Sequence, residues 1–328
     1  VYYYIILYYN IMTLNILVTG GSGFLGSHLV DELIKNENNM IYNIDKLDYC
    51  SYNNIILSAK NYKFIKGDIC SNDLITFILN EYKISIVYHL ASQTHVDNSF
   101  YNSLQFTYDN ICGTHTLLEC CRKYNKIEKF IHMSTDEVYG EVLLDNEIKS
   151  ENSLLKPTNP YAATKASAEL LVASYYKSFK LPIFIVRCNN IYGPRQYPEK
   201  VIPSFIYNLL NNEKCYIQGK GNTERHFIYV SDVVAALLTI FNYGKINEIY
   251  NISNNYNIKI IDLAQKLIKK IKKTEEYSKH IEFIEDRNFN DFRYLINSDK
   301  LESLGWEPKM DFDNGIQLVI DYFSLNSY

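Results

Sequence analysis

Tyr161 and Lys165 form a Tyr-x-x-x-Lys pair, a pattern that can carry acid–base chemistry. On a helix, residues four apart lie on one face. A lysine ammonium beside a phenol favours the phenolate and lowers the phenol pKa, which makes Tyr161 a candidate general base. The chain holds 30 tyrosines and five pairs at this spacing, so the spacing alone selects nothing. Its context selects this pair, because it opens a predicted helix directly after Asn159-Pro160.

A hydroxyl and two adjacent carboxylates stand in the run Ser134-Thr135-Asp136-Glu137, at the end of a predicted strand. The carboxyl ends of parallel strands meet at one edge of a sheet. We therefore expect Thr135, Asp136 and Glu137 to converge with Tyr161 and Lys165. From the residues alone, a solvated loop at Asp136-Glu137 is an equally good reading.

Four of the 13 glycines fall within Gly20–Gly26, between a predicted strand and a predicted helix. In the pattern G-x-x-G-x-x-G, Gly20 allows a tight turn, Gly23 lets the backbone approach a pyrophosphate, and Gly26 permits close helix–strand packing. The N-terminus of the helix then offers free N–H groups to phosphates. The alternative is a structural glycine turn without a ligand.

Asp45 ends the second predicted strand, where an acidic side chain can bind the adenosine ribose of a dinucleotide. A carboxylate there repels a 2′-phosphate, which favours NAD over NADP. We expect Asp68 on the adenine side of the cofactor. The full set of predicted NAD contacts is Gly20, Gly23, Phe24, Leu25, Gly26, Asp45, Lys46, Asp68, Ile69, Leu90, Ala91, Ser92, Tyr161 and Lys165.

A parallel sheet with helices on both sides would bring these residues to one edge. Predicted strands and helices alternate along the chain as such a sheet requires. Predicted strands cover Asn15–Thr19, Met40–Asp45, Tyr62–Lys66, Ile84–Leu90, Lys129–Ser134 and Pro182–Cys188. Predicted helices cover Phe24–Lys35, Asn72–Tyr82, Ser103–Tyr124, Pro160–Lys180, Ile202–Asn211, Ser231–Phe241 and Ile260–Lys273. The pattern predicts an α/β fold, a Rossmann-like doubly wound parallel sheet with a smaller C-terminal α/β substrate lobe. Residues 12–190 would form the NAD-binding domain and residues 191–328 the lobe, with some strand exchange back to the first domain.

The composition of the 328 residues excludes several classes of partner. The net charge is −4 and there is no basic tract, so we expect neither nucleic acid nor a membrane as a partner. The seven cysteines include no C-x-x-C pair, which predicts free thiols in a reducing compartment and no metal site. Residues 1–11 are apolar, too short to span a bilayer, and precede Met12, so we expect them to be a non-native or disordered leader.

With these features in place, the chain resembles the NAD-dependent nucleotide-sugar 4,6-dehydratases of the extended short-chain dehydrogenase/reductase family, which act on dTDP-glucose or UDP-glucose. The resemblance runs from about Asn15 to Trp306. It rests on TGGSGFLGSH, HVDNS, NICGT, HMSTDEVYGE, NPYAATKA, NNIYGPRQYPEK, YNIS and DRNFNDFRY. The STDEVYG block discriminates, because UDP-galactose 4-epimerases usually have a small residue at Asp136 and Glu137, and UDP-glucuronate decarboxylases lack Asp136.

The resemblance implies a chemistry for the polar residues. Tyr161, assisted by Thr135 and Lys165, removes the C4 hydroxyl proton while hydride passes from C4 to NAD. Glu137 then takes the C5 proton, Asp136 protonates the departing C6 hydroxyl, and hydride returns from NADH to C6. The product is a 4-keto-6-deoxy sugar nucleotide of the kind used in rhamnose biosynthesis. The resemblance also implies a homodimer, and the free thiols predict a cytoplasmic protein.

Further residues match positions that hold the sugar nucleotide in this family. They are Thr94, Asn190, Lys200, Arg225, Asn251, Arg287 and Asn290. Basic and amide donors suit a diphosphate. Ser92-Gln93 replaces the Ala-Glu typical of bacterial dTDP-glucose enzymes, Asn290 replaces a frequent histidine, and Phe289–Asp291 resembles the UDP-glucose type. These departures favour UDP slightly over dTDP.

Two classes of alternative stay open. One is a UDP-sugar 4-epimerase or a UDP-glucuronate decarboxylase on the same fold. The other is a non-catalytic NAD-binding regulatory protein, which would be expected to lose Tyr161, Lys165 or the carboxylates.

Overall fold

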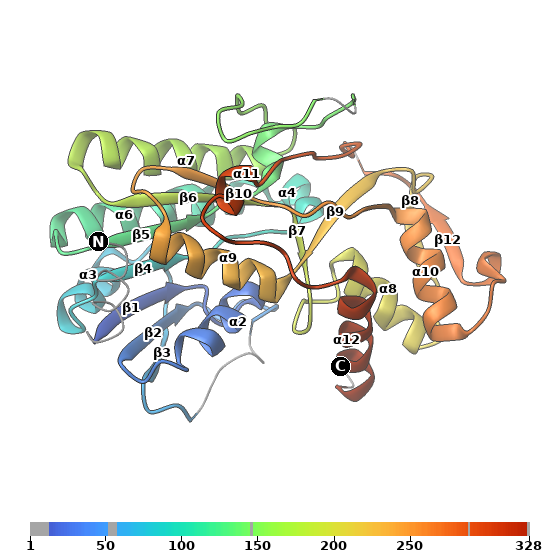
Figure 1. The fold of residues 1–328 in the computed structure, drawn as a ribbon, viewed down its shortest axis with the longest axis horizontal. Helices are drawn as coiled ribbons and strands as arrows, with labels where there is room; N and C mark the ends of the chain where they lie inside the picture. The colour runs from blue at the N-terminus through green and yellow to red at the C-terminus, as the bar shows by residue number, and fades with distance from the viewer. Residues whose placement is uncertain (1–12, 52–57, 145–146, 288, 327–328) are drawn as a thin grey trace.

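The structure, a computed structural model, describes residues 13–51, 58–144, 147–287 and 289–326, so the predicted leader at 1–11 lies outside the described residues. In these segments, seven parallel strands form one sheet in the order β10-β6-β5-β4-β1-β2-β3 (Figure 1). The strands are β1 (Leu14–Thr19), β2 (Asn39–Asp45), β3 (Tyr62–Lys66), β4 (Ile86–His89), β5 (Lys129–Met133), β6 (Ile183–Cys188) and β10 (Ile249–Ile252). Each predicted strand is present within two residues of its expected ends.

Helices cover both faces of this sheet, which confirms the predicted doubly wound fold. One face packs against α2 (Phe24–Leu33) and α9 (Val230–Tyr243), through a core that includes Leu29 and Leu237. The other face packs against α3 (Asn72–Glu81), α6 (Gly113–Tyr124) and α7 (Pro160–Phe179). The strands are apolar on both sides because both faces are buried.

The order of the strands reverses between β1 and β4. β2 lies on one side of β1 and β4 on the other, so the crossovers diverge at this point. In open α/β sheets, ligands bind outside the carboxyl ends of the strands at such a switch point. The register brings the ends of β1, β4, β5 and β6 to the same edge.

The helix predicted over 103–124 is instead divided into three pieces. They are α5 (Ser103–Phe106), a π-helical turn, η2 (Thr107–Cys112), and α6, and a further short helix, α4 (Val96–Tyr101), precedes them. The wider π-turn lets the neighbouring residues Asp109 and Asn110 both point inward. Asn110 accepts a hydrogen bond from the Gln93 backbone N–H at 2.7 Å and donates one to Thr164 at 2.9 Å. The bulge therefore ties this helical segment to the loop after β4.

The chain after β6 builds a smaller unit around its own core. Tyr192, Phe227, Leu267 and Phe312 belong to that core. Its elements are β7 (Asn190–Tyr192), α8 (Val201–Leu210), β8 (Cys215–Gln218), β9 (Glu224–Tyr229), β11 (Asn257–Lys259), α10 (Ile260–Lys272), η4 (Tyr277–Lys279), β12 (Ile281–Ile284) and α12 (Phe312–Leu325). The short helix α11 (Asp299–Glu302) instead packs against β10, and its Leu301 joins the core of the large sheet. β7, β9 and β11 form a three-stranded sheet, and β8 pairs with β12. β10, although it follows β9 in the chain, pairs with β6 in the large sheet.

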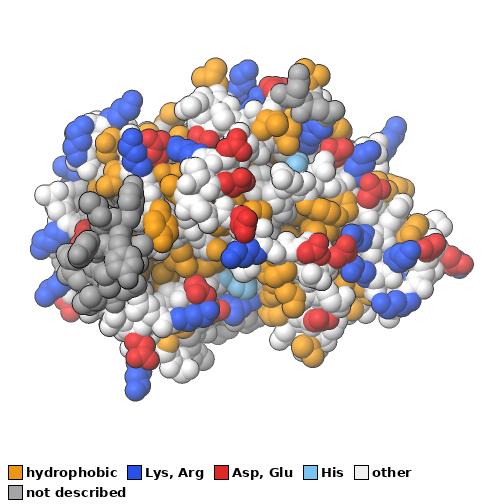
Figure 2. Space-filling view, viewed as in Figure 1, with side chains coloured by type: hydrophobic (Ala, Val, Ile, Leu, Met, Phe, Trp, Pro, Cys, Tyr) orange, Lys and Arg blue, Asp and Glu red, His pale blue; other side chains and the backbone are white. Residues whose placement is uncertain are grey.

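Figure 2 shows acidic and basic side chains interspersed on the viewed face. All seven cysteines are free. Among the described helices, none has the length and apolar character needed to cross a bilayer.

A buried ion pair fixes α7 against the sheet. Arg187 on β6 donates to the Glu169 carboxylate from Nε at 3.1 Å and from Nη2 at 2.6 Å, and both side chains are almost fully buried. Arg187 Nη1 also donates to Tyr139 Oη at 2.7 Å, and Tyr139 in turn donates to Asn251 Oδ1 at 2.8 Å. Tyr139 ends a 3₁₀ turn, η3 (Asp136–Tyr139), so this network joins β6, α7, η3 and β10.

Arg187→Met should lower the free energy of unfolding by about 3 kcal/mol or more, because it leaves the Glu169 carboxylate buried and unpaired. Arg187→Met combined with Glu169→Leu should lose less than the single variant, because the double variant buries no lone charge. Urea titration of both proteins measures the difference. A double variant less stable than Arg187→Met would contradict this account of α7.

Candidate active site

A cavity of about 300 Å³ opens at the carboxyl edge of the large sheet. Its walls come from the ends of β1, β2, β4, β5 and β6, from the start of α7 and from the loop that precedes α8. Every predicted NAD contact lines this cavity, and so do all five predicted catalytic residues: Thr135, Asp136, Glu137, Tyr161 and Lys165.

The glycine loop has a shape that only glycine allows. Gly20 has a φ of +70°, and a Cβ there would lie 2.7 Å from the Ala91 Cα. A Cβ on Gly26 would lie 2.1 Å from the Gly20 carbonyl oxygen. At Gly23, the nearest atom would be that same oxygen, at 3.2 Å. Gly20 and Gly26 therefore shape the loop itself, whereas a methyl group at Gly23 would press on one backbone oxygen only.

The N-terminus of α2 and the Asp45 carboxylate frame the two ends of this part of the cavity. Among the described residues, no side chain caps the first N–H groups of α2. Asp45 accepts hydrogen bonds from the backbone N–H groups of Ser22 at 3.1 Å and Leu47 at 2.8 Å, which fix its carboxylate at the end of β2. A glycine cradle, free helix N–H groups and a fixed carboxylate fit the pyrophosphate and ribose of NAD.

The two adjacent carboxylates are oriented by different donors. Asp136 Oδ2 accepts from Asn189 Nδ2 at 2.6 Å, and Asp136 Oδ1 accepts from Thr135 Oγ1 at 3.2 Å. Glu137 Oε2 accepts from Asn159 Nδ2 at 3.0 Å. The Asn159 side chain also caps α7, because its Oδ1 accepts from the Ala162 N–H at 2.8 Å. The helix start predicted from Asn159-Pro160 thus also positions Glu137.

Burial separates this pair from an ordinary acidic loop. Asp136 is 2% exposed, which rules out the solvated-loop reading for this residue. Burial, with the neighbouring Glu137 charge, raises the pKa of Asp136 to about 7. Burial likewise raises the pKa of Glu137, although Asn159 and Arg225 oppose the shift. A carboxyl with a pKa near neutral can hold a proton at physiological pH and deliver it.

Tyr161 and Lys165 lie beside the carboxylates on the first turns of α7, but not as the phenolate–ammonium pair that we expected. Burial and the Glu137 charge raise the pKa of Tyr161, whereas its hydrogen bond with Thr135 lowers it. Lys165 Nζ donates to the Met133 carbonyl at 2.6 Å. Burial lowers the pKa of Lys165 to about 8, and the Glu169 charge opposes that change. In this structure Tyr161 is therefore a neutral phenol at physiological pH.

The predicted substrate contacts divide into two groups. Thr94, Asn190 and Lys200 line the cavity, and Lys200 Nζ donates to the Thr94 carbonyl at 2.6 Å. In the described part of the chain, the remaining four do not line it: Arg225, Asn251, Arg287 and Asn290.

Those four side chains contact other protein groups. Arg225 donates to Asn290 Oδ1 at 3.1 Å, and Arg287 donates to Gln218 Oε1 at 3.1 Å. Asn251 is fully buried and its side chain accepts from Tyr139. A function for these four in substrate binding stays a prediction.

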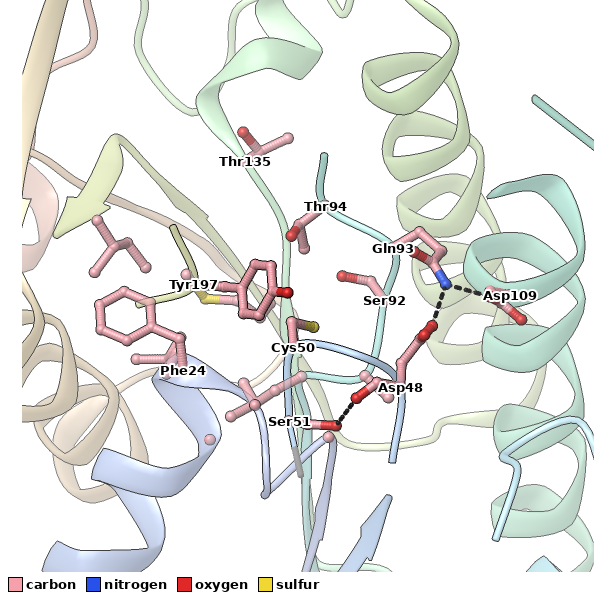
Figure 3. A pocket seen from close by; sticks show the side chains of 18 of the residues that line it. Phe24, Asp48, Cys50, Ser51, Ser92, Gln93, Thr94, Asp109, Thr135 and Tyr197 are labelled. Atoms are coloured by element: carbon pink, nitrogen blue, oxygen red, sulfur yellow. Dashed lines mark hydrogen bonds between the residues drawn. The ribbon is translucent and has the colours of Figure 1, made fainter. Parts of the chain in front are cut away.

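Sequence reasoning missed several residues that line the cavity. Gln93 Nε2 donates to Asp48 Oδ2 at 3.0 Å and to Asp109 Oδ2 at 2.8 Å, and Figure 3 shows it between the two carboxylates. Tyr49 donates to Glu199 across the mouth of the cavity. The frequency of tyrosine hid Tyr49, whereas the departure at Gln93 was visible in the sequence.

Comparison with known proteins adds independent findings. The family model described as GDP-mannose 4,6 dehydratase matches residues 17–319. The human dTDP-D-glucose 4,6-dehydratase is 47% identical over 95% of this chain and 90% of its own length. A trifunctional Arabidopsis thaliana protein, whose name includes UDP-glucose 4,6-dehydratase, is 44% identical over 95% of this chain and 47% of its own length.

Solved structures give the same picture of the fold. The dTDP-glucose 4,6-dehydratase DesIV from Streptomyces venezuelae, solved with NAD bound, superposes with a TM-score of 0.91 at 31% identity. That match covers 95% of this chain and 98% of the other. UDP-sugar 4-epimerases are also among the similar solved structures. The fold alone therefore does not distinguish a dehydratase from an epimerase.

Gly23→Ala and Gly26→Ala should fail in different ways. Gly26→Ala places a methyl group against backbone, so it should lower stability by about 1–3 kcal/mol as well as NAD binding. Gly23→Ala should change stability by no more than about 1 kcal/mol but weaken NAD binding at least about tenfold, because its methyl group points where the pyrophosphate approaches. Thermal unfolding and calorimetric NAD titration measure the two effects. Wild-type NAD affinity in Gly23→Ala would refute the assignment of the phosphate site.

Proposed function

The chain belongs to the GDP-mannose 4,6-dehydratase family and is a nucleotide-sugar 4,6-dehydratase, and from that premise we propose the reaction that it catalyses. The reaction is conversion of dTDP-glucose or UDP-glucose to the 4-keto-6-deoxy sugar nucleotide, with loss of one water. The observation that carries the proposal is the convergence of Asp136, Glu137, Tyr161 and Lys165 in one cavity beside the glycine loop.

Tyr161 would act first, on the C4 hydroxyl. NAD, when bound, supplies the hydride acceptor and later the hydride donor, together with a positive charge on the nicotinamide. Tyr161 Oη takes the C4 hydroxyl proton, and the Thr135 hydroxyl, which is hydrogen-bonded to it, orients the phenol. Because burial keeps Tyr161 neutral without ligands, the positive charges of Lys165 and the nicotinamide must favour the phenolate.

The two carboxylates would carry the elimination. A 4-keto group acidifies the C5 proton, which Glu137 removes as a base. Asp136, whose pKa lies at about 7, gives its proton to the departing C6 hydroxyl. One carboxyl must be ionised and the other neutral, and an adjacent pair favours that division because two negative charges side by side repel.

The carboxylates also weigh against the alternatives. An epimerase needs no acid–base pair for C5 and C6, and a decarboxylase of this fold lacks the equivalent of Asp136. A regulatory protein would have no reason to keep Asp136 buried beside Glu137 with an oriented donor for each, since burial of ionisable groups is costly.

The finer assignments belong to the same proposal. Lys200, Asn190 and Thr94 would contact the sugar nucleotide, and the residues of the glycine loop with Asp45 would hold NAD. Relatives named for dTDP-glucose and for UDP-glucose are both close, so the slight preference for UDP stays a prediction. We also propose a homodimer, supported by the exposed apolar side chains of Leu104 on α5 and Leu170 on α7. A cytoplasmic location belongs to the same proposal and is supported by the free thiols.

Purified protein incubated separately with dTDP-glucose and UDP-glucose should yield a product one water lighter, without added NADH. Mass spectrometry of the sugar nucleotides measures the product, and the ratio of the two kcat/KM values identifies the preferred nucleotide. A galactose isomer would support the epimerase. Bound NAD with no turnover of either sugar would support the regulatory reading.

Asp136→Asn should reduce product formation about 100-fold or more, as expected for loss of a general acid, and should affect C4 oxidation much less. Single-turnover absorbance of reduced nicotinamide reports C4 oxidation, and mass spectrometry reports elimination. Asp232→Asn is the matched control, because Asp232 is also buried but lies on α9 and accepts from the Met310 N–H. Equal loss of both half-reactions in Asp136→Asn would argue against an acid at this position.

A further inference from the structure

Asn189 is the residue that contacts Asp136 most closely from outside its own turn. It follows β6 directly, is 3% exposed and lines the cavity. Its backbone N–H donates to the Ile252 carbonyl on β10 at 3.1 Å, which anchors the residue to the sheet. Its side-chain Nδ2 donates to Asp136 Oδ2 at 2.6 Å.

This contact makes the two oxygens of Asp136 unequal. Oδ2 faces an N–H donor that cannot accept a proton, because an amide nitrogen is a donor only. Oδ1 faces the Thr135 hydroxyl, which can donate or accept. A proton on Oδ2 would oppose the Asn189 N–H, so the acidic proton of Asp136 belongs on Oδ1. That oxygen lies on the side of Thr135, which also contacts Tyr161.

The other charged or titratable groups that interact with Asp136 come from four elements. Glu137 on η3 disfavours its ionised form, whereas Arg225 on β9 favours it. In the other direction, the charge of Asp136 raises the pKa of Tyr161 on α7. Cys188 at the end of β6 is also close enough to interact with it. Asn189 differs from these groups because it is neutral and bonds directly to one oxygen of the carboxyl group.

We propose that Asn189 is a positioning residue for the acid of the elimination step. Its amide holds the Asp136 carboxyl in one orientation, keeps the transferable proton on Oδ1, and stabilises the carboxylate once the proton has moved to the C6 oxygen. The inference rests on the proposed function of Asp136. It explains why an uncharged amide, rather than a basic side chain, stands here: a cation at this distance would ionise the acid before it acted.

The pH dependence of elimination tests the inference. Asp136 must be protonated to act, so the rate falls as the pH rises through the pKa of Asp136. An N–H donor to the carboxylate favours ionisation, so its loss raises that pKa. Asn189→Leu replaces the side chain with one of similar size that has no donor. It should raise the pH at which kcat falls on the alkaline side, here called the alkaline limb, by about one pH unit, and it should lower the maximal kcat about tenfold or more. Asn189→Asp should move the limb further, because a second carboxyl then shares the proton.

Two controls make the outcome specific. Asp136→Asn should abolish the alkaline fall in kcat, which would attribute that fall to the ionisation of Asp136. Asn39→Leu removes another buried amide, which donates to the Leu33 carbonyl at the far end of β2, and should keep the wild-type limb. Suppose that the wild-type protein eliminates water, and that both Asn189 variants bind NAD and show the same alkaline pKa in kcat as the wild type. The positioning role of Asn189 is then wrong, while the proposed function stands. If wild type eliminates no water from either sugar nucleotide, the proposed function fails and this inference with it.

Discussion

The packing of two adjacent carboxyl groups at the end of β5, Asp136 buried and Glu137 half-buried, is the constraint on which the site depends. Neither Asp136 nor Glu137 can be desolvated cheaply, and together they repel. The fold offsets this with a directed donor for each: Asn189 for Asp136 and Asn159 for Glu137. Asn189 follows β6 and Asn159 caps α7. The positions of the two carboxylates therefore depend on the positions of β6 and α7.

The rest of the architecture serves to hold those elements in register. β5 and β6 pair in parallel, which brings Ser134–Glu137 and Asn189 to one edge. The Arg187–Glu169 pair fixes α7 to β6, and through Tyr139 it also fixes the turn that carries the carboxylates. The glycine loop stands at the switch point of the same sheet. Cofactor and acid–base groups therefore meet because parallel strands end together.

Local signals in the sequence predicted much of this site. Contacts between residues far apart in the chain could not be predicted from such signals. Scarce glycines grouped at Gly20–Gly26 and the Asn159-Pro160 start of α7 each act within one turn of the chain, so pattern reasoning located them. The contact of Asn189 with Asp136 joins residues far apart in the sequence and depends on strand register. The raised pKa of Tyr161 depends on burial, which the spacing of Tyr161 and Lys165 does not encode. The π-turn at Asp109 likewise follows from tertiary partners.

The structure keeps the Asp136 carboxyl about half protonated at pH 7, and titration of this single group is the decisive measurement. Carbon-13 NMR of the full-length protein labelled at aspartate side chains follows each carboxyl with pH, and the spectrum of Asp136→Asn assigns the signal. Asp136 should titrate with a midpoint at about pH 7. A midpoint at about 4, the value of an ordinary solvated aspartate, would contradict it.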